Sequence, residues 1–164
     1  MGIAAMKSAP RVGFGYDIHR LTAGRPLVLG GVRIDSDRGL LGHSDGDAVL
    51  HAVSDAIFGA IGSGDIGEHF PDSDPANEGL DSREILRAAV DEVAAMKRSV
   101  SSADVTILAE RPKLGLSKDD IRRSLADLLG LTADRVAVKA RTNEGLGPIG
   151  QQQAIACYAV VVIA

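Results

Sequence analysis

Three of the four histidines in this chain of 164 residues, His19, His43 and His51, lie close together in the sequence. Asp17 stands two positions before His19 in the segment GFGYDIH. Residues two positions apart in a β-strand point to the same face, so a strand here would present the carboxylate and the imidazole side by side. This spacing is typical of a metal-chelating pair.

His51 adds a third candidate ligand from a different kind of element. Asp47, His51 and Asp55 recur every four residues and would share one face of a helix. Asp47 or Asp55 could then orient the imidazole of His51, as metal-bound histidines usually require. Together with Asp17 and His19, His51 would form a set suited to tetrahedral zinc with a fourth position open for substrate. The residues alone also allow a site without metal, in which His51 is a hydrogen-bonded helix residue beside a solvated strand end.

Two further groups of polar residues are suited to phosphate chemistry. His43 and Ser44 come just before the expected helix, and the free N–H groups of a helix start attract anions. Ser44 is equally typical of a helix cap. Near the C-terminus, Glu144 follows a predicted strand, and magnesium favours one or two carboxylates together with phosphate oxygens. An isolated glutamate at this place would otherwise be a surface residue.

Composition excludes several classes of protein. The net charge is −4 and aromatic residues make up 3%, so the chain lacks the basic surface and the stacking rings of a nucleic-acid-binding protein. The longest apolar run, 154–164, is shorter than the ~20 residues of a membrane-spanning helix and contains the only cysteine, Cys157, which we expect to be a small buried hydrophobe. The N-terminus has no signal-peptide pattern, so we expect a cytoplasmic protein with no membrane partner.

The pattern of apolar residues predicts one α/β (α+β) domain over residues 11–164, preceded by a flexible N-terminal extension over residues 1–10. Strands and helices do not alternate strictly, which favours a mixed β-sheet with helices packed on one face. A long loop without a regular period carries His69, which we expect to be exposed. The predicted order is strands at 11–21 and 25–34, a helix within 43–62 opened by Ser44 and Asp47, the loop 62–79, a helix at 81–97, a strand at 102–110, a helix at 116–130, and strands at 135–142 and 154–164.

Six ordered segments of residues 11–164 resemble the 2-C-methyl-D-erythritol 2,4-cyclodiphosphate synthases of the non-mevalonate isoprenoid pathway. They are GFGYDIH, GLLGHSDGDAVLHA, GDIGEHFPDSDP, DSRE, ERPKL and TNE. The resemblance implies a homotrimer with active sites between subunits. It also implies a phosphorus–oxygen lyase reaction. In 4-diphosphocytidyl-2-C-methyl-D-erythritol 2-phosphate, the 2-phosphate attacks the β-phosphorus, which releases CMP and the cyclic diphosphate.

The resemblance also assigns roles to the metal-binding and catalytic residues. It implies that zinc is bound by Asp17, His19 and His51 and that Glu144 helps to hold magnesium. It places His43 and Thr142 at the positions that stabilise the transition state, with Ser44 at the phosphate end of the site. No activated serine or cysteine is needed, because an intramolecular phosphoryl transfer depends on positioning and charge neutralisation.

For the small-molecule cytidine diphosphate substrate, the resemblance implies two binding segments. The segment around the ribose and methylerythritol comprises Asp65, Ile66, Gly67, Phe70, Pro71, Asp72, Ser73 and Asp74. The cytosine pocket comprises Ala109, Glu110, Arg111, Pro112, Lys113, Leu114 and Gly115. Arg141 and Asn143, which flank Thr142, complete the implied contacts.

The chain departs from the family pattern near the implied trimer axis. It has Pro148 where an aromatic residue is common and Gln151-Gln152-Gln153-Ala154 where an Arg-Gly-Glu-Gly segment is common. Because no arginine stands at position 151, we expect no regulation by an isoprenoid diphosphate at the axis. Two other functions compete with the synthase. A metal-dependent phosphoesterase would need more histidine ligands, and no histidine follows His69. An inactive trimeric zinc-binding module is disfavoured because His43, Thr142 and Glu144 are all present.

Overall fold

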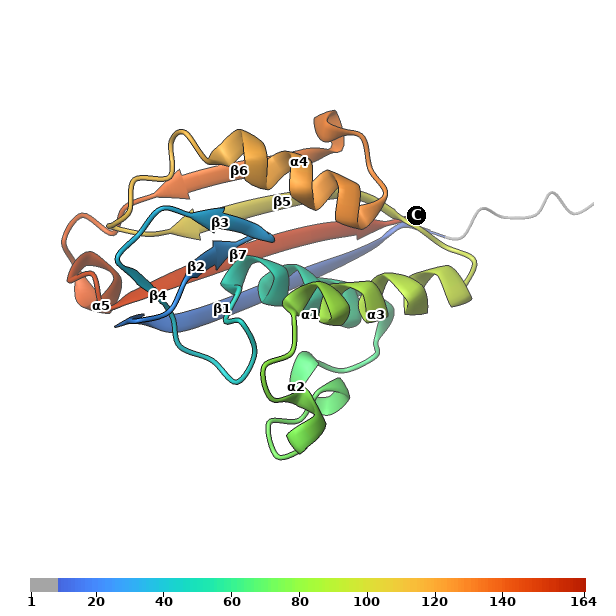
Figure 1. Cartoon of the computed structure of the whole chain (residues 1–164). Coiled ribbons are helices and arrows are strands. Elements are labelled where there is room, and N and C mark those ends of the chain that lie inside the picture. Colours follow the sequence, from blue (N-terminus) through green and yellow to red (C-terminus); the bar gives the residue numbers. More distant parts are fainter. Residues whose placement is uncertain (1–8) are drawn as a thin grey trace, which may run out of the picture.

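The structure, a computed structural model, describes residues 9–164 (Figure 1). The predicted N-terminal extension therefore lies almost entirely outside the described residues. A five-stranded sheet crosses the molecule in the order β4-β1-β7-β5-β6, with β5 and β6 parallel and the other pairs antiparallel. Its strands are β1 (Arg11–Ala23), β4 (Arg38–Leu40), β5 (Val100–Leu108), β6 (Val136–Arg141) and β7 (Ala154–Ile163).

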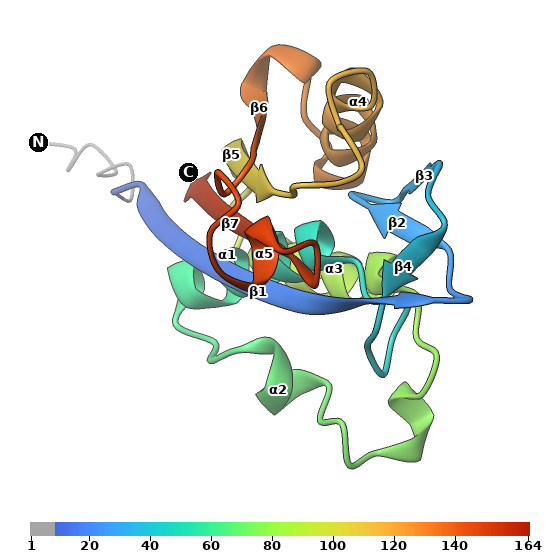
Figure 2. The same cartoon turned by 90° about the vertical axis from the view of Figure 1, so that its left-hand side faces the viewer.

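The three long helices form one layer against this sheet, as Figure 2 shows from the side. They are α1 (Ala48–Ile61), α3 (Ser82–Ala95) and α4 (Lys118–Leu129). A two-stranded hairpin of β2 (Leu27–Leu29) and β3 (Val32–Ile34) completes the layer. The short elements are α2 (Ile66–His69), η1 (Pro75–Asn77), η2 (Ala133–Arg135) and α5 (Gly147–Gly150). The predicted single domain, with a mixed sheet and helices on one face, is confirmed.

Three predictions about elements were wrong. The predicted strand 25–34 is the β2–β3 hairpin, because Gly30 and Gly31 adopt positive φ angles of 61° and 75° and turn the chain back. The strand β4 was missed because it has only three residues. The expected loop 62–79 contains α2 and η1, which are each too short to show a periodic pattern. Within residues 9–164, no helix has the length and apolarity to cross a membrane.

Asp47 fixes the start of α1, which lies three residues later than the predicted cap at Ser44. Its carboxylate accepts hydrogen bonds from the N–H groups of Val49 and Leu50 in the first turn of the helix, both at 3.0 Å. It also accepts the N–H groups of Gly30 and Gly31 at 2.8 and 2.6 Å. The side chain is fully buried, and burial raises the pKa of Asp47 although these N–H groups oppose the rise. One carboxylate thus ties the β2–β3 turn to the helix.

Two glycines of β1 let α1 pack against the strand, backbone to backbone. A Cβ atom on Gly13 would lie 1.7 Å from the carbonyl oxygen of Ala56, and one on Gly15 would lie 2.0 Å from the carbonyl oxygen of Ala52. No rotamer change can relieve contacts with backbone atoms. Only glycine therefore fits at these two positions, which explains the GFG pattern at the start of the strand.

The face of the sheet that points away from the helices carries exposed apolar side chains. Phe14 is 63% exposed and Tyr16 43% exposed on β1, and both rings lie near Tyr158 on β7, with centroid separations of 6.1 and 4.9 Å. The neighbouring Val12, Ile18 and Val160 are also exposed. We call Val12, Phe14, Tyr16, Ile18, Tyr158 and Val160 the open sheet face. A contiguous apolar surface of this kind on a soluble domain usually marks a contact with another protein chain.

The contact between β1 and α1 makes a testable prediction about stability. Gly15→Ala should lower the free energy of unfolding by about 1–3 kcal/mol, because its methyl group overpacks against the backbone of α1. Gly59→Ala is the matched control, because a Cβ at Gly59 on α1 meets no atom within 4 Å. It should raise stability by about 0.5–1 kcal/mol through helix propensity. Chemical denaturation measures both values, and equal stability of the two variants would contradict the close contact.

Candidate metal centre and active-site cleft

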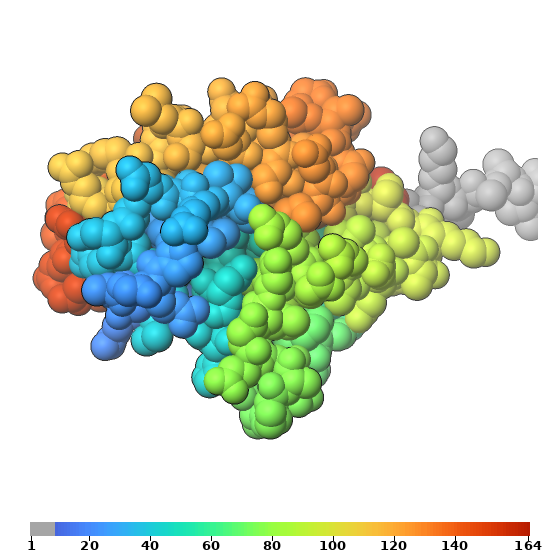
Figure 3. Space-filling model, in the orientation of Figure 1, coloured from blue at the N-terminus to red at the C-terminus, as the bar shows by residue number. Residues whose placement is uncertain are grey.

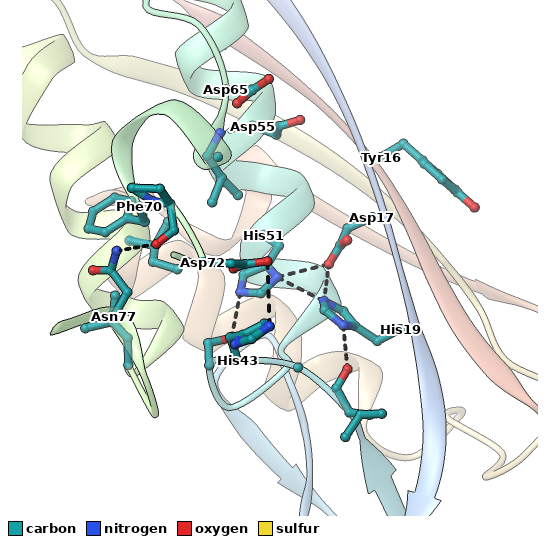
Figure 4. A pocket seen from close by; sticks show the side chains of 18 residues that line it. Tyr16, Asp17, His19, His43, His51, Asp55, Asp65, Phe70, Asp72 and Asn77 are labelled. Carbon is teal, nitrogen blue, oxygen red and sulfur yellow. Dashed lines mark hydrogen bonds and ion pairs between the residues drawn. The ribbon is translucent and has the colours of Figure 1, made fainter. Parts of the chain in front are cut away.

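Asp17, His19 and His51 converge on one point between β1 and α1 (Figure 4). The Oδ2 atom of Asp17 lies 2.8 Å from Nε2 of His19 and 3.0 Å from Nδ1 of His51. The two imidazole nitrogens are 3.1 Å apart. Asp17 and His19 lie on the face of β1 that points toward the helices. His51 lies in the first turn of α1, which packs against this face. The predicted convergence of these three side chains is therefore confirmed.

Hydrogen bonds on the far side of each imidazole determine which nitrogen faces the centre as an acceptor. Nδ1 of His19 donates to the carbonyl oxygen of Leu41 at 2.8 Å, so its Nε2 presents a lone pair to Asp17. Nε2 of His51 lies 3.1 Å from Oγ of Ser44 and 2.9 Å from Oγ of Ser82. Three acceptor atoms that face one another at about 3 Å repel unless a cation lies between them. The site therefore fits a divalent metal ion.

The charges at this centre are coupled. Burial opposes ionisation of Asp17. When no ion lies at the centre, however, the facing ring nitrogens of His19 and His51 can carry hydrogens that they donate to Asp17, and these hydrogen bonds outweigh burial and lower the pKa of Asp17 to about 2. Burial likewise lowers the pKa of His19, but the hydrogen bond and the charge of Asp17 prevail, so that the pKa of His19 is raised. Asp17 is thus an anionic ligand throughout the physiological range, and its charge attracts a cation to the centre.

The orienting residues that the sequence suggested for His51 have other partners. Asp47 caps α1, and Asp55 accepts the N–H of Ile66 at 3.0 Å. Instead, the second nitrogen of His51 meets Ser44 and Ser82. Ser82 lies far along the chain in the DSRE segment, and no local spacing connects it with a histidine on another helix.

The three ligands lie in the wall of a cleft of about 960 Å³. Its other walls come from α1, from the segment before α1 and from the loop 62–79, which forms the green projection at the lower edge in Figure 3. The cleft contains eleven of the residues predicted for the site, namely Asp17, His19, His43, Ser44, His51, Asp65, Ile66, Gly67, Phe70, Pro71 and Asp72. It also contains Asp55, which the sequence suggested only as a partner of His51, and six residues that were not assigned to the site, namely Tyr16, Leu41, Gly42, Asn77, Leu80 and Ile85.

Two residues assigned to the sugar-binding loop lie outside the cleft. Ser73 and Asp74 do not line it and are exposed, and the carboxylate of Asp74 accepts the N–H of Ala76 at 2.9 Å to cap η1.

His43 lines the cleft, and its Nε2 lies 3.9 Å from the carboxylate of Asp72. The cleft therefore presents one imidazole that is largely exposed and lies beside a carboxylate.

His69 anchors the loop, and the prediction that it is exposed was wrong. Its ring stacks on Phe58 of α1 with a centroid separation of 4.0 Å and an interplanar angle of 9°. Nε2 donates to the carbonyl oxygen of Ser63 at 2.6 Å, and Nδ1 lies 3.4 Å from the carboxylate of Glu92 on α3. His69 thus joins the loop to two helices, although nothing in its sequence neighbours indicated a partner.

The remaining predicted site residues form a second group at the ends of β5 and β6. The N–H of Ala109 donates to the carbonyl oxygen of Arg141 at 2.9 Å, and the N–H of Asn143 donates to the carboxylate of Glu110 at 3.1 Å. These bonds join the segments Ala109–Gly115 and Arg141–Glu144, and Arg111, Pro112 and Lys113 line a separate cavity of about 370 Å³.

The side chain of Glu144 is held in place within this second group. Thr142 donates its hydroxyl hydrogen to Oε1 of Glu144 at 3.0 Å. Glu144 adopts a φ of +51°, which is uncommon for a residue with a side chain and is often found at functional sites. Glu144 is an exposed residue in the turn that follows β6.

Within one chain, the two groups do not meet. Ile18 pairs with Ala156, Ala156 with Leu108, and Leu108 with Arg141, so three strand spacings separate the metal ligands from the end of β6. This separation is about 14 Å. Neither Thr142 nor Glu144 lines the cleft. The described residues thus contain two half-sites, one with the three converging ligands and one with Glu144.

A third cavity, of about 590 Å³, is lined by residues at which the chain departs from the family pattern. It is lined by Pro148, Gln151, Gln152 and Gln153 and also by Arg20 and Arg38. The absence of an arginine at position 151 therefore does not leave this cavity without cationic side chains. The expectation that no isoprenoid diphosphate binds near these residues stays a prediction.

Comparisons with known proteins agree with this geometry. The model of the YgbB family matches residues 10–164. The 2-C-methyl-D-erythritol 2,4-cyclodiphosphate synthase of Ralstonia pickettii is 52% identical over 153 residues, which are 93% of this chain and 91% of that protein.

Two solved structures are similar as well. A 2C-methyl-D-erythritol-2,4-cyclodiphosphate synthase with CDP bound is 42% identical, with a TM-score of 0.87 over 94% of this chain and 100% of that chain. The bifunctional IspDF of Campylobacter jejuni is 39% identical, with a TM-score of 0.90. The match covers 94% of this chain but only 42% of that longer protein. The match of the family model over nearly the whole chain, at these levels of identity, shows that the chain belongs to the YgbB family.

Proposed function

We propose that residues 11–164 form a 2-C-methyl-D-erythritol 2,4-cyclodiphosphate synthase domain. It would convert 4-diphosphocytidyl-2-C-methyl-D-erythritol 2-phosphate into the cyclic diphosphate and CMP. The observation that carries this proposal is the convergence of Asp17, His19 and His51 in the wall of a large cleft, in a chain that is about half identical to named synthases. The CDP in a related structure supports a cytidine nucleotide as part of the substrate.

Two cations fit the two half-sites. Two imidazoles and one carboxylate favour zinc at the triad, and a single exposed carboxylate favours magnesium at Glu144, completed by phosphate oxygens. When bound, such ions polarise phosphoryl oxygens and neutralise their charge. The residues of the chain position the substrate, so that the 2-phosphate lies in line with the β-phosphorus and attack by water is disfavoured.

The remaining groups fit the parts of this substrate. In this proposal, His43 and a Thr142 from a neighbouring copy would stabilise the charge on the transferring phosphoryl group, and Ser44 would lie at the phosphate end of the cleft. Asp65, through its carboxylate, and Gly67, through its backbone, suit the hydroxyls of the ribose and the methylerythritol. The segment Ala109–Gly115 offers backbone groups that can read the edge of a cytosine, and its Lys113 adds a cation for the diphosphate.

A homotrimer with active sites between subunits accounts for the two half-sites. The distance of about 14 Å between them prevents a single chain from surrounding one phosphate with both groups. The open sheet face, with Phe14, Tyr16 and Tyr158 at its centre, provides an apolar surface through which copies of the chain can associate. A neighbouring copy would then supply its Glu144 and Thr142 to the cleft beside His51.

The proposed reaction is tested directly with the purified protein, zinc, magnesium and the cytidine diphosphate substrate. We expect phosphorus NMR to show CMP and two coupled signals from the cyclic diphosphate. A phosphoesterase would release inorganic phosphate instead. If the protein binds the metals but releases no CMP, it is the inactive zinc-binding module.

Removal of one ligand tests the metal centre. His51→Ala should abolish stoichiometric zinc binding in a metal assay, because two ligands remain where three are needed. The trimer should persist in sedimentation experiments, since His51 lies away from the open sheet face. Full retention of zinc would remove His51 from the ligand set.

Mixed trimers test whether each active site spans two subunits. His51→Ala and Glu144→Ala should each be inactive, but coexpression should restore activity at about a quarter of the interfaces, where two intact half-sites meet by random assembly. Coexpression of His51→Ala with Asp17→Ala is the control, since both changes damage the same half-site and no interface becomes intact. Activity that stays absent in the first mixture would show that each site belongs to one chain.

A further inference from the structure

Nε2 of His51, the ring nitrogen that points away from Asp17 and His19, belongs to a series of hydrogen-bonded polar side chains. Apart from His51, none of them is a predicted metal ligand. Oγ of Ser82 lies 2.9 Å from Nε2 of His51, and the same oxygen donates its hydrogen to the carboxylate of Asp45. Ser82 is the first residue of α3 and is fully buried, and His51 lies on α1. This series of hydrogen bonds thus connects α1 with α3 within the helix layer.

The direction of these hydrogen bonds follows from the chemistry of their partners. An ionised carboxylate can only accept, so the hydroxyl hydrogen of Ser82 is committed to Asp45. The lone pairs of Ser82 are then left to accept the Nε2–H of His51. This arrangement places the imidazole hydrogen on Nε2 and leaves a lone pair on Nδ1, the atom that faces Asp17 and His19.

The other hydroxyl beside His51 cannot impose the same arrangement. Oγ of Ser44 lies 3.1 Å from Nε2 and accepts the N–H of Gly46 at 3.1 Å. Within residues 9–164, no carboxylate takes the hydroxyl hydrogen of Ser44, which can therefore donate to Nε2 of His51. Such a bond would favour the opposite tautomer, with a hydrogen on Nδ1 that points at Asp17 and blocks a metal ion. Ser82 and Asp45 favour the Nε2 tautomer against the combined effect of Ser44 and Asp17.

Asp45 is itself held firmly between the two helices. Its Oδ2 accepts the N–H of Ser82 at 3.3 Å and its Oδ1 accepts the N–H of Asp47 at 3.2 Å. Its own N–H donates to the carbonyl oxygen of Leu80 at 3.2 Å. Because both ends of the residue are bound, its carboxylate has a fixed position from which to orient the hydroxyl of Ser82.

From this geometry we infer that Ser82 and Asp45 are positioning residues that hold His51 as an Nδ1 ligand. They act through His51 and touch neither the ion nor the substrate. The inference rests on the proposed metal centre, and it adds two residues that the sequence did not connect with the site. Groups of this kind around a metal ligand typically change metal affinity by 10–100-fold when they are removed.

Zinc affinity, measured by competition with a chromophoric chelator, tests this inference without substrate. Ser82→Ala should weaken zinc binding by about 10–100-fold. Ser82→Thr keeps the hydroxyl and should restore most of the affinity. Ser54→Ala is the matched control, because Ser54 is also fully buried on α1 but donates its hydroxyl hydrogen to the carbonyl oxygen of Leu50 rather than bonding to the ring of His51. Its zinc affinity should equal that of the unchanged protein.

Nitrogen NMR of the metal-free protein provides a second measurement that a loss of stability alone would not move. Asp17 attracts a hydrogen to Nδ1 of His51 when no ion is bound, and the bond to Ser82 opposes it by favouring Nε2. The share of His51 with its hydrogen on Nε2 should therefore be larger in the unchanged protein than in Ser82→Ala, and Asp45→Asn, which keeps the shape of the side chain, should lower this share in the same direction.

The outcomes separate the inference from the proposed function. If the unchanged protein binds no zinc, the metal centre is wrong and the role of Ser82 falls with it. If the unchanged protein binds zinc and Ser82→Ala binds it equally well, with the same His51 tautomer, the metal centre stands and the role of Ser82 and Asp45 is overturned.

Discussion

The direct contact of α1 with β1 is the constraint on which the site depends. Gly13 and Gly15 have no side chains, so the carbonyl oxygens of Ala56 and Ala52 lie where Cβ atoms would otherwise stand. His51 lies in the first turn of α1, directly before Ala52, and here the strand and the helix are close enough for short side chains to share one ion. With a normal strand-to-helix distance, Asp17 and His51 could not reach each other, because aspartate and histidine side chains are short.

The two faces of the sheet carry different kinds of side chain, metal ligands on one and exposed apolar residues on the other. Alternation along β1 sends Asp17 and His19 to the helix side and Tyr16 and Ile18 to the open sheet face. A single strand therefore carries both metal ligands and part of the surface proposed to bind other copies of the chain. The proposed assembly would bring the two half-sites together with no long loop, since the short segment at the end of β6 already presents Glu144.

Sequence reasoning found what local periodicity encodes. The i, i+2 spacing of Asp17 and His19, together with the periodicity of the helix that carries His51, was enough to predict the triad and the faces of β1. It could not find groups that meet through tertiary packing. Ser82 reaches His51 only because α3 lies beside α1, and His69 is held by Phe58 and Glu92 on different helices. The β2–β3 turn is different, because the pair Gly30–Gly31 is a local hairpin signal that the prediction of one strand overlooked.

The anchors of the loop 62–79 connect the proposed substrate-binding residues with the metal centre. At its start, Asp55 holds the N–H of Ile66, and His69 fixes the end of α2. At its end, the N–H of Gly79 donates to the carbonyl oxygen of His43 at 2.7 Å, directly beside the pair formed by Asp45 and Leu80. Both ends of the loop are therefore tied to the elements that position His51. Between these anchors, the side chain of Asn77 donates to the carbonyl oxygen of Pro71 at 3.0 Å, so the middle of the loop is braced as well. A loop held in this way suits a reaction whose rate depends on how accurately two phosphates of one molecule are held together.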